Sequence, residues 1–248
     1  MQFAQYLAAI VVAGLIALAA DGPARAQDVA CVPFTRDLPV APEPREDAGA
    51  RARFDAIKAQ LKARAYPVLF LGDSLTQQWD ANLWRDHMAL RGVLNAGVSG
   101  DRTEHLRWRL DHGNLAGPPP RVAIVLIGTN DIGHGRPPEV TAEGIRAVLI
   151  QLRARLPATR VLLLGLLPRG ATVTDHFRRQ IGAVNRMIAA CADSQSIFYA
   201  DIGGVLLDSR GQLNKPVSPD TLHFSPRGYA LLVPRLDALL DPLISGFR

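Results

Sequence analysis

Two hydrophobic periodicities alternate along this chain. Runs of consecutive apolar residues predict buried strands at 68–71, 93–95, 122–127, 161–167 and 197–200. Between them, apolar residues recur every three or four positions and predict amphipathic helices at 46–64, 101–111, 139–156, 177–191 and 229–240. A further helix carrying Trp79, Leu83 and Trp84 is expected after the first strand. This order predicts an α/β fold with one parallel sheet between two helical layers.

The helix at 101–111 has a recognisable start. Asp101 and Glu104 have the spacing of a capping box, so we expect Asp101 to be the N-cap residue. The Ala96–Gly100 segment before it reads as a glycine-bearing turn at the end of a strand.

The first 45 residues are expected to lie outside the folded domain. An apolar run from Tyr6 to Ala20, followed by the small residues Ala24 and Ala26, predicts a signal peptide at 1–26. The alternative is an uncleaved anchor, for which the run is short. Four prolines predict an extended arm at 27–45, followed by a single domain at 46–248. The mature chain would then be exported to the periplasm or the medium, without a membrane span.

Composition bounds the class of protein. The 248 residues are 48% hydrophobic and 21% charged, which is typical of one globular domain. The net charge of +5 comes almost entirely from arginines that are scattered over several predicted helices. A nucleic-acid-binding protein concentrates such charge in a patch, so we expect no nucleic-acid partner.

Cys31 and Cys191 are the two cysteines. Export would expose them to oxidising conditions, where they could pair and tie the arm to a helix. Cys191 also lies on the apolar face of its predicted helix, where a buried free thiol is equally compatible with the pattern. The sequence leaves both alternatives open.

Polar residues that could take part in catalysis follow three predicted strands. Ser74 comes directly after the first strand and Gly72, the 97–100 turn follows the second, and Asn130 follows the third. Ligands bind at the carboxyl edge of parallel sheets, and a serine held there is a candidate nucleophile. Glycine N–H groups and an asparagine amide are suitable donors to an oxyanion. Turn geometry alone would explain each of these residues singly, but not their common position.

A nucleophilic serine needs a base. His223 lies in a loop before the last helix, and Asp220 precedes it by three residues, so the pair could orient toward Ser74. Asp131 and His134 have the same spacing and are predicted to line the pocket instead. The other histidines are predicted to be exposed on helices, and none has the spacing of a metal site: His87, His105, His112 and His176.

With these residues in view, the chain resembles the SGNH, or GDSL-type, family of esterases and lipases. Four blocks carry the resemblance in the family's order: Gly72–Leu75, Gly100, Gly128–Asp131 and Asp220–His223. Segments 94–110, 128–130 and 166–170 are also similar to the catalytic subunits of intracellular platelet-activating-factor acetylhydrolase. A G-x-S-x-G elbow is absent, which argues against an ordinary α/β-hydrolase.

The resemblance implies a flavodoxin-like, five-stranded, three-layer fold that needs no cofactor and no metal. It implies Ser74 as nucleophile, His223 as base and Asp220 as its orienting partner. The implied oxyanion donors are the N–H groups of Ser74 and Gly100 and the side chain of Asn130.

The expected activity is hydrolysis of a small-molecule, glycan or lipid carboxylic ester through an acyl-enzyme. No insertion long enough for a lipase lid interrupts the motifs, so short acyl groups such as acetyl are favoured. The alternatives are a polysaccharide O-acetyltransferase and a non-catalytic carbohydrate- or lipid-binding module. Candidate substrate contacts are Asp73, Asp131 and Arg169, with Arg102 a further cation near a strand end; both arginines could instead be solvated surface. The sequence does not specify the oligomeric state.

Overall fold

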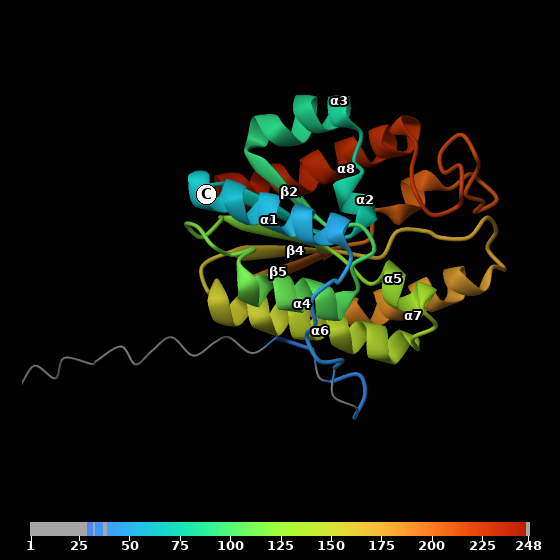
Figure 1. The fold of residues 1–248 in the computed structure, drawn as a ribbon. Coiled ribbons are helices and arrows are strands. Elements are labelled where there is room, and N and C mark those ends of the chain that lie inside the picture. Colours follow the sequence, from blue (N-terminus) through green and yellow to red (C-terminus); the bar gives the residue numbers. More distant parts are fainter. Residues whose placement is uncertain (1–28, 32, 37–38, 247–248) are drawn as a thin grey trace, which may run out of the picture.

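The computed structural model describes residues 29–31, 33–36 and 39–246 (Figure 1). All five strands are parallel and follow the order β2-β1-β3-β4-β5. Their bounds are β1 Val68–Gly72, β2 Val93–Gly97, β3 Val122–Leu126, β4 Arg160–Leu164 and β5 Ile197–Ala200. The predicted fold class, with one parallel sheet, is therefore confirmed.

Helices connect successive strands and cover both faces of the sheet (Figure 1). The α-helices are α1 Ala48–Ala63, α2 Ser74–Gln77, α3 Ala81–Leu83, α4 Thr103–His112, α5 Thr129–Gly133, α6 Pro138–Arg155, α7 His176–Ala189 and α8 Pro226–Ser245. Three short helices complete the described part: the π-helix Trp84–Met88 and the 3-10 helices Ala89–Arg91 and Gly203–Leu206.

Successive strand side chains point to opposite faces, and this alternation builds two cores. Leu69 and Leu71 pack in the cluster that contains the apolar faces of α1, α4, α6 and α7. Val68 and Phe70 pack in the other cluster, with α8 and the segment around Trp79. Because both faces are covered, the strands read as continuous apolar runs rather than as alternating patterns.

The register brings three strand ends level with one another. Gly72 of β1 lies opposite Gly97 of β2 and Leu126 of β3. The chain leaves β1 in one direction to form β2 and returns to form β3 on the other side. In this strand order, the crevice at the carboxyl ends of β1 and β3 is the expected ligand site.

The segment after β1 differs from the single helix that the sequence predicts. It is divided into α2, α3 and two short helices, because Asp80 starts a new helix by accepting hydrogen bonds from the Asn82 and Leu83 N–H groups. Trp79 lies between the pieces and is still buried, next to Phe70 and Tyr229. The apolar spacing was correct, but local capping overrides a continuous helix.

The predicted capping role of Asp101 is wrong. α4 begins at Thr103 with Arg102 in the N-cap position, and the Arg102 N–H donates to Nδ1 of His105 at 3.0 Å. Asp101 is instead fully buried and accepts from Nε of Arg109 at 2.6 Å. Asp101 therefore forms a buried ion pair with Arg109 and does not cap α4.

The ends of two further elements, β4 and α8, differ from the predicted ones. The fourth strand ends at Leu164, and the segment to Leu167 is buried without strand pairing. The last helix runs from Pro226 to Ser245, well beyond the predicted Leu240, through two internal prolines.

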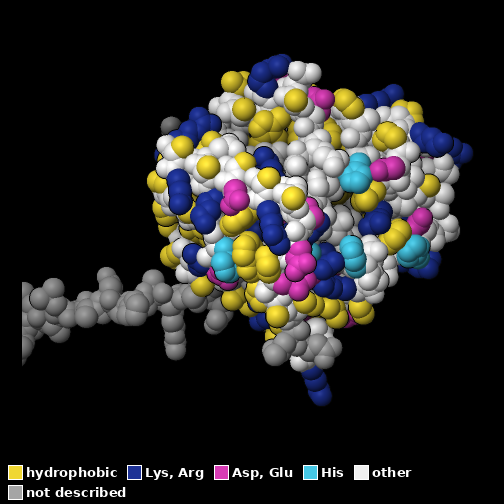
Figure 2. Space-filling view, viewed as in Figure 1, with side chains coloured by type: hydrophobic (Ala, Val, Ile, Leu, Met, Phe, Trp, Pro, Cys, Tyr) yellow, Lys and Arg dark blue, Asp and Glu magenta, His cyan; other side chains and the backbone are white. Residues whose placement is uncertain are grey.

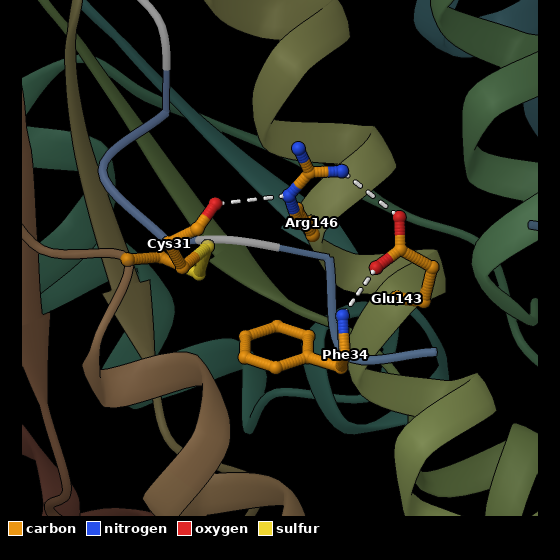
Figure 3. Close-up of a disulfide and its surroundings, with 5 residues drawn as sticks. Cys31, Phe34, Glu143 and Arg146 are labelled. Atoms are coloured by element: carbon orange, nitrogen blue, oxygen red, sulfur yellow. Dashed lines mark hydrogen bonds and ion pairs between the residues drawn. A yellow bond between two sulfur atoms is a disulfide. The ribbon is translucent and has the colours of Figure 1, made fainter. Parts of the chain in front are cut away.

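The N-terminal arm is attached to the domain rather than free on its surface. Cys31 forms a disulfide with Cys191, which follows α7. Arg146 of α6 donates to the Cys31 carbonyl at 3.0 Å and pairs with Glu143, whose other oxygen accepts from the Phe34 N–H (Figure 3). The predicted signal peptide at 1–26 lies outside the described residues.

Charge is spread over the surface. On the face shown in Figure 2, lysine and arginine side chains alternate with acidic and apolar ones instead of forming a continuous patch. None of the helices within the described ranges combines the length and hydrophobicity needed to cross a bilayer.

Candidate active site

Ser74 lies at the first position of α2, where the chain turns sharply out of β1. The turn is held by Asp73, whose Oδ1 accepts from the Leu75 N–H at 2.9 Å. Gly72 is required behind it, since a Cβ there would lie 2.3 Å from Oγ1 of Thr76. The serine is 5% exposed and faces the carboxyl edge of the sheet.

Ser74, His223 and Asp220 form one hydrogen-bonded chain. Nε2 of His223 lies 3.0 Å from Oγ of Ser74, and Nδ1 lies 2.7 Å from Oδ2 of Asp220. Oδ1 of Asp220 also accepts from the backbone N–H groups of Leu222 and His223. The same carboxylate thus fixes both the ring and the backbone that carries it.

The pKa of Asp220 follows from these contacts. Partial burial raises it, but the hydrogen bonds from the His223 side chain and from the two backbone N–H groups outweigh burial and lower the pKa of Asp220 below its usual value. Asp220 therefore remains ionised at neutral pH and can stabilise a positive charge on His223.

The loop that carries His223 is fixed from two sides. Ser218 donates through its hydroxyl to the His223 carbonyl at 2.8 Å, and the Gly170 N–H donates to the Thr221 carbonyl at 2.9 Å. Thr221 has a φ of 65°, which is unfavourable for a β-branched residue. One contact from the β4–α7 connection and one from within the loop thus hold the strained segment around Thr221 in the orientation that directs His223 toward Ser74.

The residues proposed as oxyanion donors lie beside Ser74 in the sheet order. Gly100 is in the β2–α4 turn with a φ of 80°, a conformation that favours glycine. Asn130 is in the first turn of α5, and its Nδ2 donates to the Asp101 carbonyl at 2.9 Å. An amide NH₂ has two hydrogens, so Asn130 can bridge to the Gly100 turn and still offer one donor.

Arg109 of α4 contacts the ends of these turns, and the sequence analysis did not identify it. The guanidinium is 2% exposed and donates to Asp101, to the carbonyls of Ala96 and Gly72, and to Asn114. It therefore links the ends of β1 and β2. The only signal for Arg109 in the sequence was its position on the inner side of a predicted helix. An arginine is rarely buried there unless it has hydrogen-bond or ion-pair partners.

Two predicted substrate contacts are buried instead. Asp131 is fully buried and accepts from Thr103 N–H at 3.1 Å, from Thr103 Oγ1 at 2.8 Å and from Arg136 at 2.8 Å. Burial raises the pKa of Asp131 to about 6. Asp73 is 1% exposed, and burial raises its pKa to about 7. Neither carboxylate is open to a ligand, so both are better described as scaffold residues.

The two arginines near strand ends have different surroundings. Arg169 is half-buried beside the site, where it donates to the Thr129 carbonyl at 3.0 Å and lies over the Phe177 ring. Its exposed part leaves it available to a substrate. Arg102 pairs with Glu104 and Glu43.

The alternative histidine pair is not formed. Nδ1 of His134 donates to the Asn130 carbonyl at 2.8 Å, while its expected partner Asp131 is engaged by Thr103 and Arg136. Of the other histidines, the prediction for His105 was wrong: it is buried at the start of α4.

One group of possible metal ligands occurs in the described residues, formed by Glu43, Glu104 and His105. Glu104 already pairs with Arg102 and Arg136. Although burial opposes it, these hydrogen bonds lower the pKa of Glu104 to about 2. Two arginines thus occupy the carboxylate that a cation would need, and we assign no metal here.

Comparisons with known proteins identify the family of the chain. Residues 70–231 match the model of the GDSL-like Lipase/Acylhydrolase family. The chain is 32% identical to the human platelet-activating factor acetylhydrolase IB subunit alpha1, over 82% of this chain and 90% of that protein.

Solved structures share the fold. A GDSL-like lipase from Bacteroides thetaiotaomicron superposes with a TM-score of 0.62 at 21% identity, covering 78% of this chain and 98% of that one. An acetylxylan esterase from Geobacillus stearothermophilus superposes with a TM-score of 0.56 at 18% identity, covering 73% and 94%. By its family match and its sequence relatives, the chain belongs to the GDSL-like lipase/acylhydrolase family and is a carboxylic ester hydrolase.

Proposed function

We propose that the protein is an exported serine esterase in which Ser74 is the nucleophile, His223 the base and Asp220 the group that orients it. The observation that carries the proposal is the unbroken series of hydrogen bonds from Ser74 Oγ through both ring nitrogens of His223 to Asp220. A serine hydroxyl is a weak nucleophile until an oriented base takes its proton.

The steps follow from this arrangement. Ser74 Oγ bonds to the ester carbonyl carbon while its proton passes to Nε2 of His223, and the carbonyl oxygen becomes an oxyanion. The N–H groups of Ser74 and Gly100 and the amide of Asn130 stabilise that charge. The oxyanion then collapses, the C–O bond to the alcohol breaks, and His223 protonates the leaving oxygen. Water attacks the acyl-enzyme by the same route, releasing the acid and restoring Ser74.

Exposure of the site favours hydrolysis over transfer to a sugar. The His223 side chain is 35% exposed and that of Asp220 is 54% exposed, so water reaches the base directly. An O-acetyltransferase must protect its acyl-enzyme from water, and a binding module has no need of the aligned Ser74–His223–Asp220 series.

A short acyl group, acetyl in particular, is the proposed substrate preference. The β2–α4 connection spans only residues 98–102, and the β3–α5 connection only 127–128, so neither can form a lid over a long chain. The human relative is named as an acetylhydrolase. Initial rates on 4-nitrophenyl esters from C2 to C16 should be highest at the short end, and a maximum at C12 or longer would contradict this preference.

Export is supported by the covalent link between arm and domain. A Cys31–Cys191 disulfide persists in oxidising compartments and is rare in a reducing cytosol. Together with the predicted signal peptide, it favours the periplasm or the medium. Fractionation of cells that express the full gene should recover a chain beginning near Gln27 outside the cytoplasm.

The decisive experiment is labelling with a fluorophosphonate probe, followed by identification of the modified peptide. We expect stoichiometric modification of Ser74 and loss of esterase activity in the same proportion. Ser74→Ala should fold with an unchanged melting temperature and lose activity by a factor of order 10³ or more. Retained turnover in that variant would remove Ser74 from the mechanism. Acetyl transfer to an added sugar that outpaces hydrolysis would instead identify a transferase.

A further inference from the structure

Arg45 is the last residue of the predicted N-terminal arm, before α1 and outside the part that matches the family model. Its guanidinium nevertheless reaches the turn beside the active site. Nη1 of Arg45 donates to the Ser99 carbonyl at 3.0 Å and lies 3.8 Å from Oδ1 of Asp101. Nη2 pairs with Asp47 at 2.6 Å, which fixes the other edge of the guanidinium.

The Ser99 carbonyl belongs to the same peptide unit as the Gly100 N–H, the proposed oxyanion donor. In a planar trans peptide, the C=O and N–H bonds point in opposite directions. Arg45 on the carbonyl side therefore requires the Gly100 N–H to point away from Arg45. A cation bonded to the carbonyl also polarises the peptide and strengthens its N–H as a donor.

The rest of the turn is held so that this N–H stays available. The Ser99 N–H donates to Oε1 of Gln77 at 2.6 Å, the Asp101 N–H donates to the Val98 carbonyl, and the Asp101 carbonyl accepts from Asn130. Within the described ranges, the Gly100 N–H has no hydrogen-bond partner. An unpaired backbone donor in a turn this constrained is suited to a ligand.

Gly100 and Arg45 also fit each other sterically. A Cβ on Gly100 would lie 2.5 Å from Nη1 of Arg45, so the guanidinium occupies the space that any other residue at this position would need. The positive φ and the missing side chain thus let the cation contact the peptide directly.

We propose that Arg45 is a positioning residue for the oxyanion site: by binding the Ser99 carbonyl, it orients and polarises the peptide whose N–H stabilises the transition state. This inference rests on the proposed serine-esterase mechanism. It gives the N-terminal arm, which the Cys31–Cys191 disulfide attaches to the domain, a part in catalysis.

The test compares Arg45→Ala, Arg45→Gln and Arg45→Lys in the otherwise complete chain, with 4-nitrophenyl acetate as substrate. For Arg45→Ala, we expect kcat per titrated active site to fall about 10- to 100-fold, less than for loss of a donor itself, with KM within about threefold of wild type. Lysine should restore most of kcat and glutamine less, since both can donate to the carbonyl but only lysine is charged.

A transition-state analogue supplies the second readout. Affinity for a short-chain trifluoromethyl ketone, which forms a tetrahedral oxyanion on a serine, should fall by the same factor as kcat/KM. Arg85→Ala is the matched control. Arg85 also forms an ion pair with a nearby aspartate, since its Nε lies 2.7 Å from Oδ1 of Asp86, but this pair does not contact the Ser99–Gly100 turn. The Arg85→Ala variant should keep the wild-type kcat, KM and affinity for the trifluoromethyl ketone.

The outcomes separate this inference from the proposed function. If Ser74→Ala abolishes activity but Arg45→Ala keeps wild-type kcat and inhibitor affinity, only the role of Arg45 is wrong. A lower melting temperature with unchanged kcat per active site would likewise reduce Arg45 to a structural role. Should Arg45→Ala fail to fold, the ratio of kcat between the lysine and glutamine variants decides, and equal values would overturn the proposal. Full activity of Ser74→Ala would instead refute the mechanism itself.

Discussion

At the scale of single residues, the candidate site depends on contacts between distant positions. Ser74 and His223 are 149 residues apart in the chain and share a hydrogen bond of 3.0 Å. Spacing identified both Asp-x-x-His pairs, but not which histidine reaches the serine. Burial of Asp131 against Thr103 and Arg136 removes one pair from consideration.

This contrast gives a direct prediction. His223→Ala should reduce kcat/KM for an aryl acetate by a factor of order 10³ or more, because the base is lost. His134→Ala should stay within about threefold of wild type, since the His134 ring contacts only the Asn130 carbonyl among the interactions described for it. Steady-state kinetics on both variants checks this, and the reverse order would exchange the two assignments.

Asp73 leads to a prediction about stability. Burial raises the pKa of Asp73 from 3.8 to about 7. Between these pH values, the folded chain holds a proton that the unfolded chain has released, so folding becomes less favourable as pH rises. The cost for one such group is up to about 1.4 kcal/mol per pH unit.

Asp73→Asn should remove this dependence while its side-chain oxygen still accepts from the Leu75 N–H. We expect the stability of the variant relative to wild type to increase as pH rises from about 4 to about 7. Urea unfolding at intervals across this range measures the difference. Asp55→Asn, at an exposed position of α1, is the control. A difference that is constant with pH would contradict an Asp73 that is protonated in the folded state.

At the scale of elements, local hydrogen bonding decided where helices begin and end. Periodicity predicted the long helices α1 and α6 within two residues of their observed ends. Periodicity failed between Ser74 and Arg91, where Asp80 starts a new helix. The capping-box spacing failed at Asp101, which binds Arg109 instead of capping α4. Caps compete with tertiary partners for the same polar side chain, and sequence alone does not show which wins.

α8 provides a prediction at this scale. Pro234 lies inside the helix, is exposed, and lacks the N–H that would bond to the Ala230 carbonyl. Pro234→Ala should therefore stabilise the protein by about 1–3 kcal/mol and raise the melting temperature by several degrees. Thermal unfolding checks this. Pro226→Ala is the control, because proline is favoured at the first helical position and its loss should bring no gain. A lower melting temperature for Pro234→Ala would show that the proline fits a bend that the packing requires.

At the scale of the whole molecule, a disulfide joins the N-terminal arm to the segment after α7. Cys31 and Cys191 are 160 residues apart, and their bond closes a loop that contains α1 to α7 and β1 to β4. Such a link disfavours the unfolded state. The sequence left pairing and a buried thiol open; the structure brings the two residues together through the docking of the arm on α6 and α7.

Replacing both cysteines by serine should lower the free energy of unfolding by about 2–5 kcal/mol. Urea unfolding measures the loss, and wild-type protein kept under reducing agent should unfold like the double variant. Equal stability of the oxidised protein and the variant would mean that the link contributes nothing in solution.

The sequence was sufficient to predict the order of the elements and the polar residues that could take part in catalysis. Continuous apolar runs indicate strands that are buried on both faces, and the alternation of these strands with amphipathic helices predicts a parallel sheet. The polar residues after each strand followed too, because parallel strands present their carboxyl ends at one edge.

The tertiary structure adds contacts between distant residues that the sequence pattern does not specify. The burial of Asp73 and Asp131 and the contact of Arg45 with the Ser99 carbonyl could not be seen in the sequence pattern, whereas the pairing of His223 with Ser74 was already expected. The physical reason is that such contacts depend on how loops and the arm pack over the sheet. Spacing along the chain records which local structures can form, but not which distant side chain satisfies a buried polar group.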